Sequence, residues 1–508
     1  MFRFGTEPSV SDPSVHNFTI EGGGTEELNI ENGTYHKYRK ALASASPVLK
    51  DSDPTQIHPV LQDGNAIVVL LESSRPNLTD FRATEFVTAG GLHLHLTRAG
   101  CIGTINRIYV VEGLSPDYVS VLGHHFSIDP KFFQQQLLHH GNGFNLEDTK
   151  NPLLLRRDLD SHSHEPCAGD AFHLQYCELR KFDRVIEDLP FVCPMTGRAI
   201  DMLSRHFQEE STTAVLRRKV SWWNRSRPDG SWDAIILCDP PLTDVAPCSK
   251  IKDYMTLQNV PYQGGYDDFI PSPGQRAAHG VVKHPQYSMC IDLCYYFQHQ
   301  AHHFTDHEWM DATTSSTFIK KIVAAQYQRV TEYTRVMLPP LELILTTTWV
   351  EEQAEWSILQ AASSRCVAYA GDIVGNISAL GYQISRRSVC TDAMMQAANN
   401  NWKDCETDFQ YIHFRLEALE DRTNRLLRSM AGLASIAGNR QNLEEAKRRK
   451  RLSLLILEFG PLLAASMFFT MQHQFLPGGP QFWMYAVGAL GSVFFTASAD
   501  WYMRKLLK

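Results

Sequence analysis

The most constraining feature of the sequence is a long uncharged stretch near its C-terminal end. From Phe459 to Ala499, 41 consecutive residues include no Asp, Glu, Lys or Arg. Residues 452–470 carry a single formal charge, Glu458, and residues 482–499 carry none. As helices rising about 1.5 Å per residue, both segments approach the roughly 30 Å hydrocarbon thickness of a bilayer. The sequence therefore predicts a transmembrane hairpin over residues 452–508, with spans at about 452–471 and 482–501. The alternative is a buried hairpin of a soluble domain, which the tandem arrangement and charged flanks disfavour.

Basic residues on both sides of the hairpin predict its orientation. Lys447, Arg448, Arg449, Lys450 and Arg451 precede the first span, and Arg504, Lys505 and Lys508 follow the second. The connecting segment 472–481 contains no Lys or Arg. The positive-inside rule then places the N- and C-termini in the cytoplasm. The basic run is also compatible with a nuclear localisation signal or a lipid-headgroup patch.

Length, charge and cysteine content limit which structures and partners the rest of the chain can have. A chain of 508 residues is too long to fold around one hydrophobic core, so we expect two or more structural units. Its net charge of −8 gives no reason to expect nucleic acid as a partner. The eleven cysteines follow no repeating spacing, so we expect reduced thiols. The first residues lack an apolar segment, so we expect no signal peptide. Residues 1–58 are polar and are predicted to form a disordered tail.

A long helix is predicted immediately before the hairpin. Apolar or small residues recur there every three or four positions: Ala398, Trp402, Cys405, Phe409, Ile412, Leu416, Leu419, Thr423, Leu426, Met430, Leu433 and Ala437. Such a narrow, sustained stripe indicates a helix that packs along a seam, on a partner helix or on copies of itself. Two further helices are predicted, at 317–337 and from Trp349 to near Gly381, separated by a break at Pro339–Pro340. Residues 313–451 are thus expected to form a helical bundle with a stalk helix.

Residues 59–312 show mixed α/β patterning. Segments 66–72, 92–100, 107–112 and 232–241 are short apolar or alternating runs typical of strands. Segments 130–140 and 199–210 show helical patterning. The expected fold class is therefore an α/β cytoplasmic domain plus a long helical stalk and two C-terminal transmembrane helices.

This order of parts resembles the CorA family of divalent-metal channels. That family has Leu-Thr at the start of its first span, then Pro, then Gly-Met-Asn at its outer end. Leu452–Ser453, Pro461 and Thr470–Met471–Gln472 stand at the matching spacing. Segments 121–133 and 230–241 look like parts of the divergent CorA-like proteins of filamentous fungi. The resemblance implies a homo-oligomer, a pentamer in the family, whose first span lines a pore.

The resemblance also implies the function and its residues. We expect a channel for divalent cations such as magnesium, which is the transported or regulatory ion, with no covalently bound cofactor. Thr470, Met471 and Gln472 would form the selectivity loop, in which Thr replaces the family's Gly and Gln replaces its Asn. Glu458 is a candidate pore residue, because a charge inside a span usually faces a bundle interior or a water-filled path. The alternative is a structural role, in which Glu458 forms a hydrogen bond with a neighbouring helix. The alternative is a membrane-anchored CorA-like scaffold or signalling protein that no longer conducts ions.

Two local clusters admit other functions. Cys290, Cys294, His299, His302, His303 and His307 could supply zinc ligands, but their spacing matches no regular finger, which favours buried thiols and surface imidazoles. Asp158, Asp160, His162 and His164 are predicted to lie in an exposed loop. The sequence contains no phosphate-binding loop, nucleophile elbow or His-Glu-x-x-His motif, so we do not expect an enzyme.

Overall fold

The computed structural model describes residues 19–20, 66–74, 77–98, 105–137, 171–186, 191–203, 211–247, 255–270, 287–344, 349–384, 401–469 and 478–506. The chain divides into two compact units, Met1–Thr423 and Asn424–Lys508. Most of the predicted tail 1–58 and the loop 158–167 lie outside the described residues.

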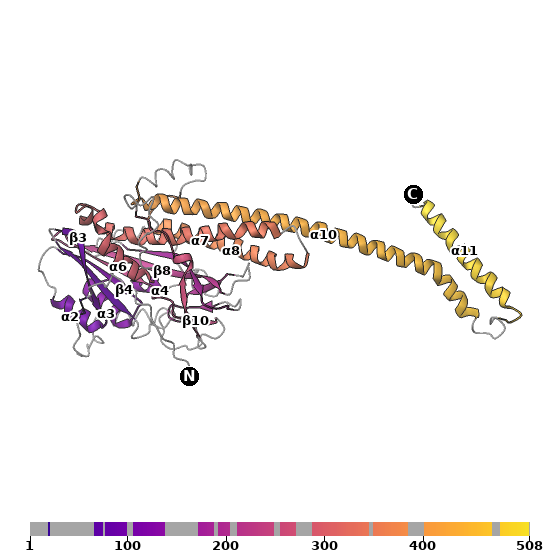
Figure 1. Cartoon of the computed structure of the whole chain (residues 1–508), viewed down its shortest axis with the longest axis horizontal. Coiled ribbons are helices and arrows are strands. Elements are labelled where there is room, and N and C mark those ends of the chain that lie inside the picture. The colour runs from indigo at the N-terminus through magenta and orange to yellow at the C-terminus, as the bar shows by residue number, and fades with distance from the viewer. Residues whose placement is uncertain are drawn as a thin grey trace, which may run out of the picture. The chain divides into compact units, whose positions relative to one another are not determined.

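The first unit is built around a mixed sheet of twelve strands among the described residues (Figure 1). Its main path runs in the order β1-β3-β2-β4-β9-β8-β7-β6-β10-β11, while β5 pairs with β8 and β12. The strands are β1 (Thr19–Ile20), β2 (Ile67–Ser74), β3 (Asn77–Phe86), β4 (Ile105–Glu112), β5 (Ala171–Phe182), β6 (Phe191–Val192), β7 (Ala199–Met202), β8 (Thr213–Ser226), β9 (Trp232–Cys238), β10 (Asp244–Pro247), β11 (Met255–Thr256) and β12 (Asn259–Pro261). The β4–β9 pair is parallel, whereas β2–β4 and β8–β9 are antiparallel.

Both faces of the central strands are buried. In β2, Val68 and Leu70 belong to one hydrophobic core, and Val69 and Leu71 belong to the other. Strands β4 and β9 divide their apolar side chains between the same two cores. Because successive side chains of a strand point to opposite faces, an unbroken apolar run is what a two-sided burial requires. The sheet is therefore the middle layer of an α/β/α arrangement.

Helices cover each face of the sheet. The first core contains side chains from α2 (Ala89–Arg98), α3 (Pro116–Phe126) and α4 (Pro130–Leu137). The second core joins the sheet to α6 (Met289–His299), α7 (Thr317–Ile344), α8 (Trp349–Ala379) and the start of α10 (Cys405–Phe469). Short 3-10 turns lie at Tyr262–Gly264, Ala301–His303, Glu308–Met310 and Ala312–Ser316. The predicted α/β class of this part of the chain is confirmed.

The predicted seam of the stalk helix is also confirmed. Its side chains are buried at Cys405, Phe409, Ile412, Leu416, Leu419, Thr423 and Met430, and Leu426 is half-buried. Phe409, Ile412 and Leu416 share a core with residues of α7 and α8. Along this part of the seam the packing partner is therefore the chain itself. Ala398, and the side chains of Leu433 and Ala437, lie outside the described residues.

Three local predictions were wrong. Segment 92–100 is not a strand, because Leu92 and Leu96, four residues apart, are both buried on one face of α2. Segment 199–210 begins as strand β7 rather than as a helix, because β7 pairs with β6 and β8. The expected break at Pro339–Pro340 is absent, and α7 continues to Ile344. These prolines stand near the end of the helix, where few backbone hydrogen bonds remain to be lost.

Candidate functional site

The second unit contains the remainder of α10 and helix α11 (Phe482–Leu506). The predicted selectivity residues Thr470, Met471 and Gln472 fall in the segment 470–477, outside the described residues. Glu458 lies within α10, but its side chain is likewise not described. Within the part of the chain that the structure describes, no helix is long and apolar enough to cross a membrane. The two spans therefore stay a prediction.

Large apolar side chains are exposed along both helices of this unit. In α10 they are Leu452, Ile456, Phe459, Leu463 and Met467, exposed by between 55% and 74%. In α11 they include Trp483, Val487, Leu490, Phe494, Phe495 and Trp501, exposed by between 60% and 77%. A water-exposed apolar surface this continuous is unfavourable for a soluble monomer and marks an interaction surface.

A polar contact links the two helices of this unit. The hydroxyls of Ser466 in α10 and Tyr485 in α11 lie 3.1 Å apart and are partly buried. Their two residues come from opposite sides of the connecting segment, so the contact holds α10 and α11 together as a hairpin. The predicted loop residues 470–472 belong to that connection.

Charged contacts fix α10 on α7 in the first unit. Lys321 of α7 is buried; its ammonium pairs with Asp408 and donates to the Asp404 carbonyl at 3.0 Å. Burial raises the pKa of Asp408, and the Lys321 ammonium opposes that rise. Two helical turns further along α10, Arg415 donates to the Glu332 carboxylate at 2.6 Å. These ion pairs fix how α10 is oriented against α7, in addition to the apolar contacts of the seam.

Helix α8 is held on the sheet by polar contacts at its buried face. Asn376 exchanges two hydrogen bonds with the backbone of Gln175 in β5. Asp372 lies 3.5 Å from the guanidinium of Arg217 in β8, which also lies 3.9 Å from Asp201. Burial raises the pKa of Asp372 to about 6, although Arg217 opposes the rise. The α8–sheet interface thus contains a titratable carboxyl.

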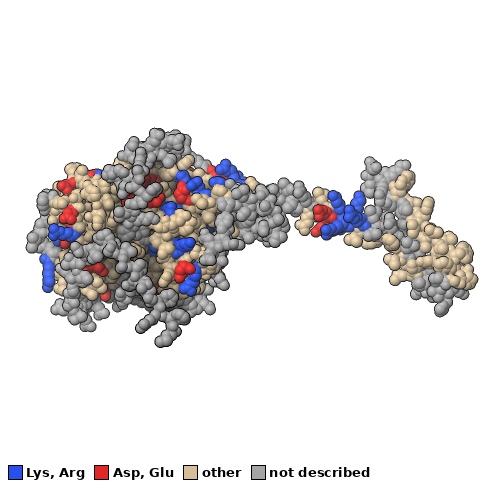
Figure 2. All heavy atoms as spheres, viewed as in Figure 1, with Lys and Arg blue, Asp and Glu red and all other residues tan. Residues whose placement is uncertain are grey.

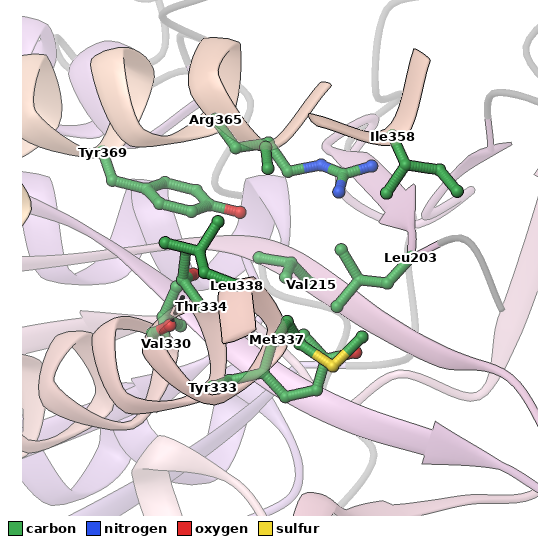
Figure 3. A pocket seen from close by; sticks show the side chains of 11 residues that line it. Leu203, Val215, Val330, Tyr333, Thr334, Met337, Leu338, Ile358, Arg365 and Tyr369 are labelled. Carbon is green, nitrogen blue, oxygen red and sulfur yellow. Dashed lines mark hydrogen bonds between the residues drawn. The ribbon is translucent and has the colours of Figure 1, made fainter. Parts of the chain in front are cut away.

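A small cavity lies beside this interface, between α7, α8, β8 and Leu203, which directly follows β7 (Figure 3). Its volume is about 40 Å³, and its lining is mostly apolar. The buried hydroxyl of Tyr369, which lines it, has no hydrogen-bond partner among the residues that the structure describes. Pockets for organic ligands usually measure roughly 300–1,000 Å³. This cavity has room for a few water molecules and not for such a ligand.

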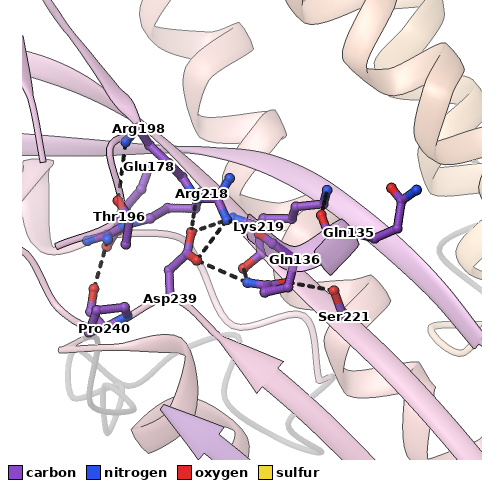
Figure 4. A network of polar contacts seen from close by, with 10 residues as sticks. All are labelled: Gln135, Gln136, Glu178, Thr196, Arg198, Arg218, Lys219, Ser221, Asp239 and Pro240. Carbon is purple, nitrogen blue, oxygen red and sulfur yellow. Dashed lines mark hydrogen bonds and ion pairs between the residues drawn. The ribbon is translucent and has the colours of Figure 1, made fainter. Parts of the chain in front are cut away.

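A buried polar network surrounds Asp239, directly after β9 (Figure 4). Its carboxylate pairs with Arg198, at 2.6 Å from Nε and 3.0 Å from Nη2, and accepts from the Lys219 backbone at 2.7 Å. Gln136 of α4 donates to the same carboxylate at 3.0 Å. Because this buried carboxylate is hydrogen-bonded from several sides, the network ties α4, the β6–β7 turn and β8 together.

A second ion pair lies in the same region. Glu178 of β5 pairs with Arg218, at 3.1 Å from Nε, and with Arg180. Burial alone would raise the pKa of Glu178, but the two guanidiniums outweigh it and hold the pKa below its usual value. Arg218 also donates to the Pro240 carbonyl at 2.8 Å. Glu178 is therefore neutralised by arginines of its own sheet.

The structure does not assemble the proposed zinc ligands. Cys290 and Cys294 are buried in α6, where the hydrogen bond between them, together with burial, raises the pKa of the Cys290 thiol. His299, His302 and His307 are exposed. Among the described side chains, no three His, Cys, Asp or Glu residues are arranged to hold a metal ion. The interpretation as buried thiols and surface imidazoles accounts for these residues.

No protein-family model matches the chain, and no curated protein sequence matches it either. The structure is similar to the CorA magnesium transporter from Methanocaldococcus jannaschii, with 11% identity over 85% of this chain and 96% of that chain. The TM-score of this similarity is 0.26.

Proposed function

We propose that the chain is a homo-oligomeric membrane channel or transporter for divalent cations such as magnesium. In this proposal α10 and α11 cross the bilayer as a hairpin, both termini lie in the cytoplasm, and copies of the chain surround a pore lined by the end of α10. The family resemblance would make the oligomer a pentamer. The proposal assigns no catalytic step to the chain.

The observation that carries the proposal is the apolar surface of the second unit. Both helices expose large apolar side chains, and residues 459–499 contain no formal charge. Acyl chains and neighbouring copies of the hairpin are the surroundings in which such a surface is favourable. The spacing of Pro461 and Thr470–Met471–Gln472 supports the narrower assignment to a CorA-like pore.

The chemistry of the connecting segment favours a hydrated cation. Magnesium dehydrates reluctantly and usually keeps several of its waters when bound. The CorA family, which the sequence resembles, holds such a hydrated cation through backbone carbonyls and an Asn side-chain amide. Gln472 supplies a side-chain amide at the predicted pore mouth, and residues 470–472 add backbone carbonyls. The mouth 472–481 contains no acidic residue, so we expect weaker cation concentration there than an acidic mouth would give.

Magnesium uptake by proteoliposomes tests the proposal. The full chain, reconstituted around a magnesium-sensitive dye, should admit Mg²⁺, and Gln472→Ala should reduce uptake or alter the preference among divalent cations. Gln481→Ala is the matched control, because it removes an amide from the other end of the connection and should leave uptake unchanged. An inserted, oligomeric wild-type protein that passes no divalent cation would instead support the alternative, a CorA-like scaffold that no longer conducts ions.

A further inference from the structure

Five consecutive cations encircle α10 in the second unit. Lys447, Arg448, Arg449, Lys450 and Arg451, here called the basic collar, all have exposed side chains. Because successive residues of a helix are about 100° apart, five in a row reach every side of it. The collar therefore presents positive charge around the whole helix rather than on one face.

The charge of the collar is not balanced by its own unit. Glu444 and Glu445 stand one turn earlier, so the five cations and two carboxylates of residues 444–451 leave a net charge of +3. Among the described residues, the ion pair recorded for the collar joins Arg449 to Glu445 at 3.6 Å, with side chains 82% and 51% exposed. A surface pair of this kind contributes little stability. The collar is therefore a strong attractor for external anions.

The apolar surface begins where the collar ends. Leu452 follows Arg451 directly and is 59% exposed, and Ile456, one turn later, is 70% exposed. Figure 2 shows the blue side chains of this unit beside its tan hairpin. Cations that border an exposed apolar helix lie at the depth of the headgroups once that helix is surrounded by acyl chains. Neither a soluble anion nor a nucleic acid accounts for this border.

We propose that the basic collar binds the anionic headgroups of one bilayer leaflet and thereby selects anionic phospholipids around the protein. The proposal rests on the proposed membrane hairpin and adds the identity of its lipid partner. Each cation near a negative membrane surface favours binding about fivefold, so a net charge of +3 favours anionic over neutral lipid about 100-fold at low salt. Screening reduces that preference as the ionic strength rises.

The lipid retained by the full-length protein tests this proposal. The protein is reconstituted in vesicles of phosphatidylcholine with a minor share of phosphatidylserine, extracted in mild detergent, and its co-purifying lipids are counted by mass spectrometry. The wild type should retain phosphatidylserine several-fold above its share in the vesicle, and less so at high salt. The variant Arg448→Gln/Lys450→Gln should lose most of this enrichment. Arg425→Gln/Arg428→Gln, which removes two exposed cations of the same helix outside the collar, should keep it.

The outcomes separate this proposal from the proposed function. An inserted and conducting wild-type protein whose retained lipid matches the vesicle composition overturns the lipid proposal alone. Equal loss of enrichment in both double variants also overturns it, because net charge rather than the collar would be responsible. A protein that alkaline carbonate removes from the vesicles overturns the membrane hairpin as well. Salt-sensitive binding of a fluorescent RNA that the collar variant loses, without lipid enrichment, would assign the collar to nucleic acid instead.

Discussion

Asn376 of α8 completes the edge of strand β5 by pairing with Gln175. The backbone N–H of Gln175 donates to Asn376 Oδ1 at 2.9 Å, and Asn376 Nδ2 donates to the Gln175 carbonyl at 2.7 Å. A side-chain amide thus makes the two hydrogen bonds that a neighbouring strand would make. Asn376 is only 2% exposed, so water cannot replace it there. This contact fixes the rotation and position of α8 on the sheet.

Replacing Asn376 should destabilise the first unit. Asn376→Ala leaves both backbone groups of Gln175 without a partner, and each buried unsatisfied group costs about 1–3 kcal/mol. We expect thermal unfolding of the full-length protein at a clearly lower temperature. Ser378→Ala is the matched control, because Ser378 is exposed on the same helix. An unchanged unfolding temperature for Asn376→Ala would show that the pair does not hold α8.

Glycosylation at Asn77 should report the topology. Of the five sequons, those at Asn224 and Asn376 are buried, at 6% and 2% exposure, so a lack of glycans there carries no information. Asn77, at the start of β3, is exposed. In microsomes we expect Asn77 to stay unmodified, while an acceptor in a flexible spacer inserted after Gly479 is modified. If the wild type carries a glycan that the Asn77→Gln variant lacks, the first unit lies in the microsome lumen. That result would contradict the predicted topology.

Removing Asp408 should cost more than removing both partners of its ion pair. Asp408→Asn leaves the buried Lys321 ammonium without a counter-charge, which typically costs about 3–5 kcal/mol. The double variant Lys321→Met/Asp408→Leu removes both charges and should unfold closer to the wild type. Unfolding temperatures of the three proteins check this order. Equal destabilisation by the single and the double variant would contradict it.

The stability of the first unit should depend on the protonation of Asp372. The folded pKa of about 6 lies above the ordinary 3.8, so between these values the folded state binds more protons than the unfolded state. The contribution of Asp372 to stability is therefore present at low pH and lost as the pH rises through 6, by about 3 kcal/mol in all. Asp372→Asn should remove this pH dependence. We expect the stability difference between variant and wild type to change between pH 4 and pH 7.

The exposed variant Asp80→Asn serves as the control for that comparison. It should unfold in parallel with the wild type across the same pH range. If the wild type and Asp372→Asn also stay parallel, Asp372 is not the titrating group.

The periodic parts of the chain were predictable, and the polar contacts were not. The unbroken apolar run of β2 and the three-to-four spacing of α10 follow from burial of apolar side chains, which a sequence displays directly. Segment 92–100 was mistaken for a strand because Leu-His-Leu-His-Leu fits a period of two as well as the four-residue spacing of Leu92 and Leu96.

Contacts between distant segments leave a weaker signal in the sequence. Asn376 stands between Ile373 and Ile377 on the apolar face of α8, and a polar residue in that position indicates a buried hydrogen bond. Its partner lies 201 residues away, so only the fold identifies Gln175. The predicted pore residues depend on how copies of the chain assemble around an ion, and periodicity within one chain does not encode that arrangement.

The reversal potential of the reconstituted protein tests the central claim most directly. A tenfold magnesium gradient across a planar bilayer containing the full-length protein should shift the reversal potential toward the magnesium equilibrium value, about 30 mV for a doubly charged ion. Gln472→Ala should move that potential away from this value, whereas Gln481→Ala should not. A stably inserted protein with no current, or with a reversal potential that ignores the magnesium gradient, would contradict the account.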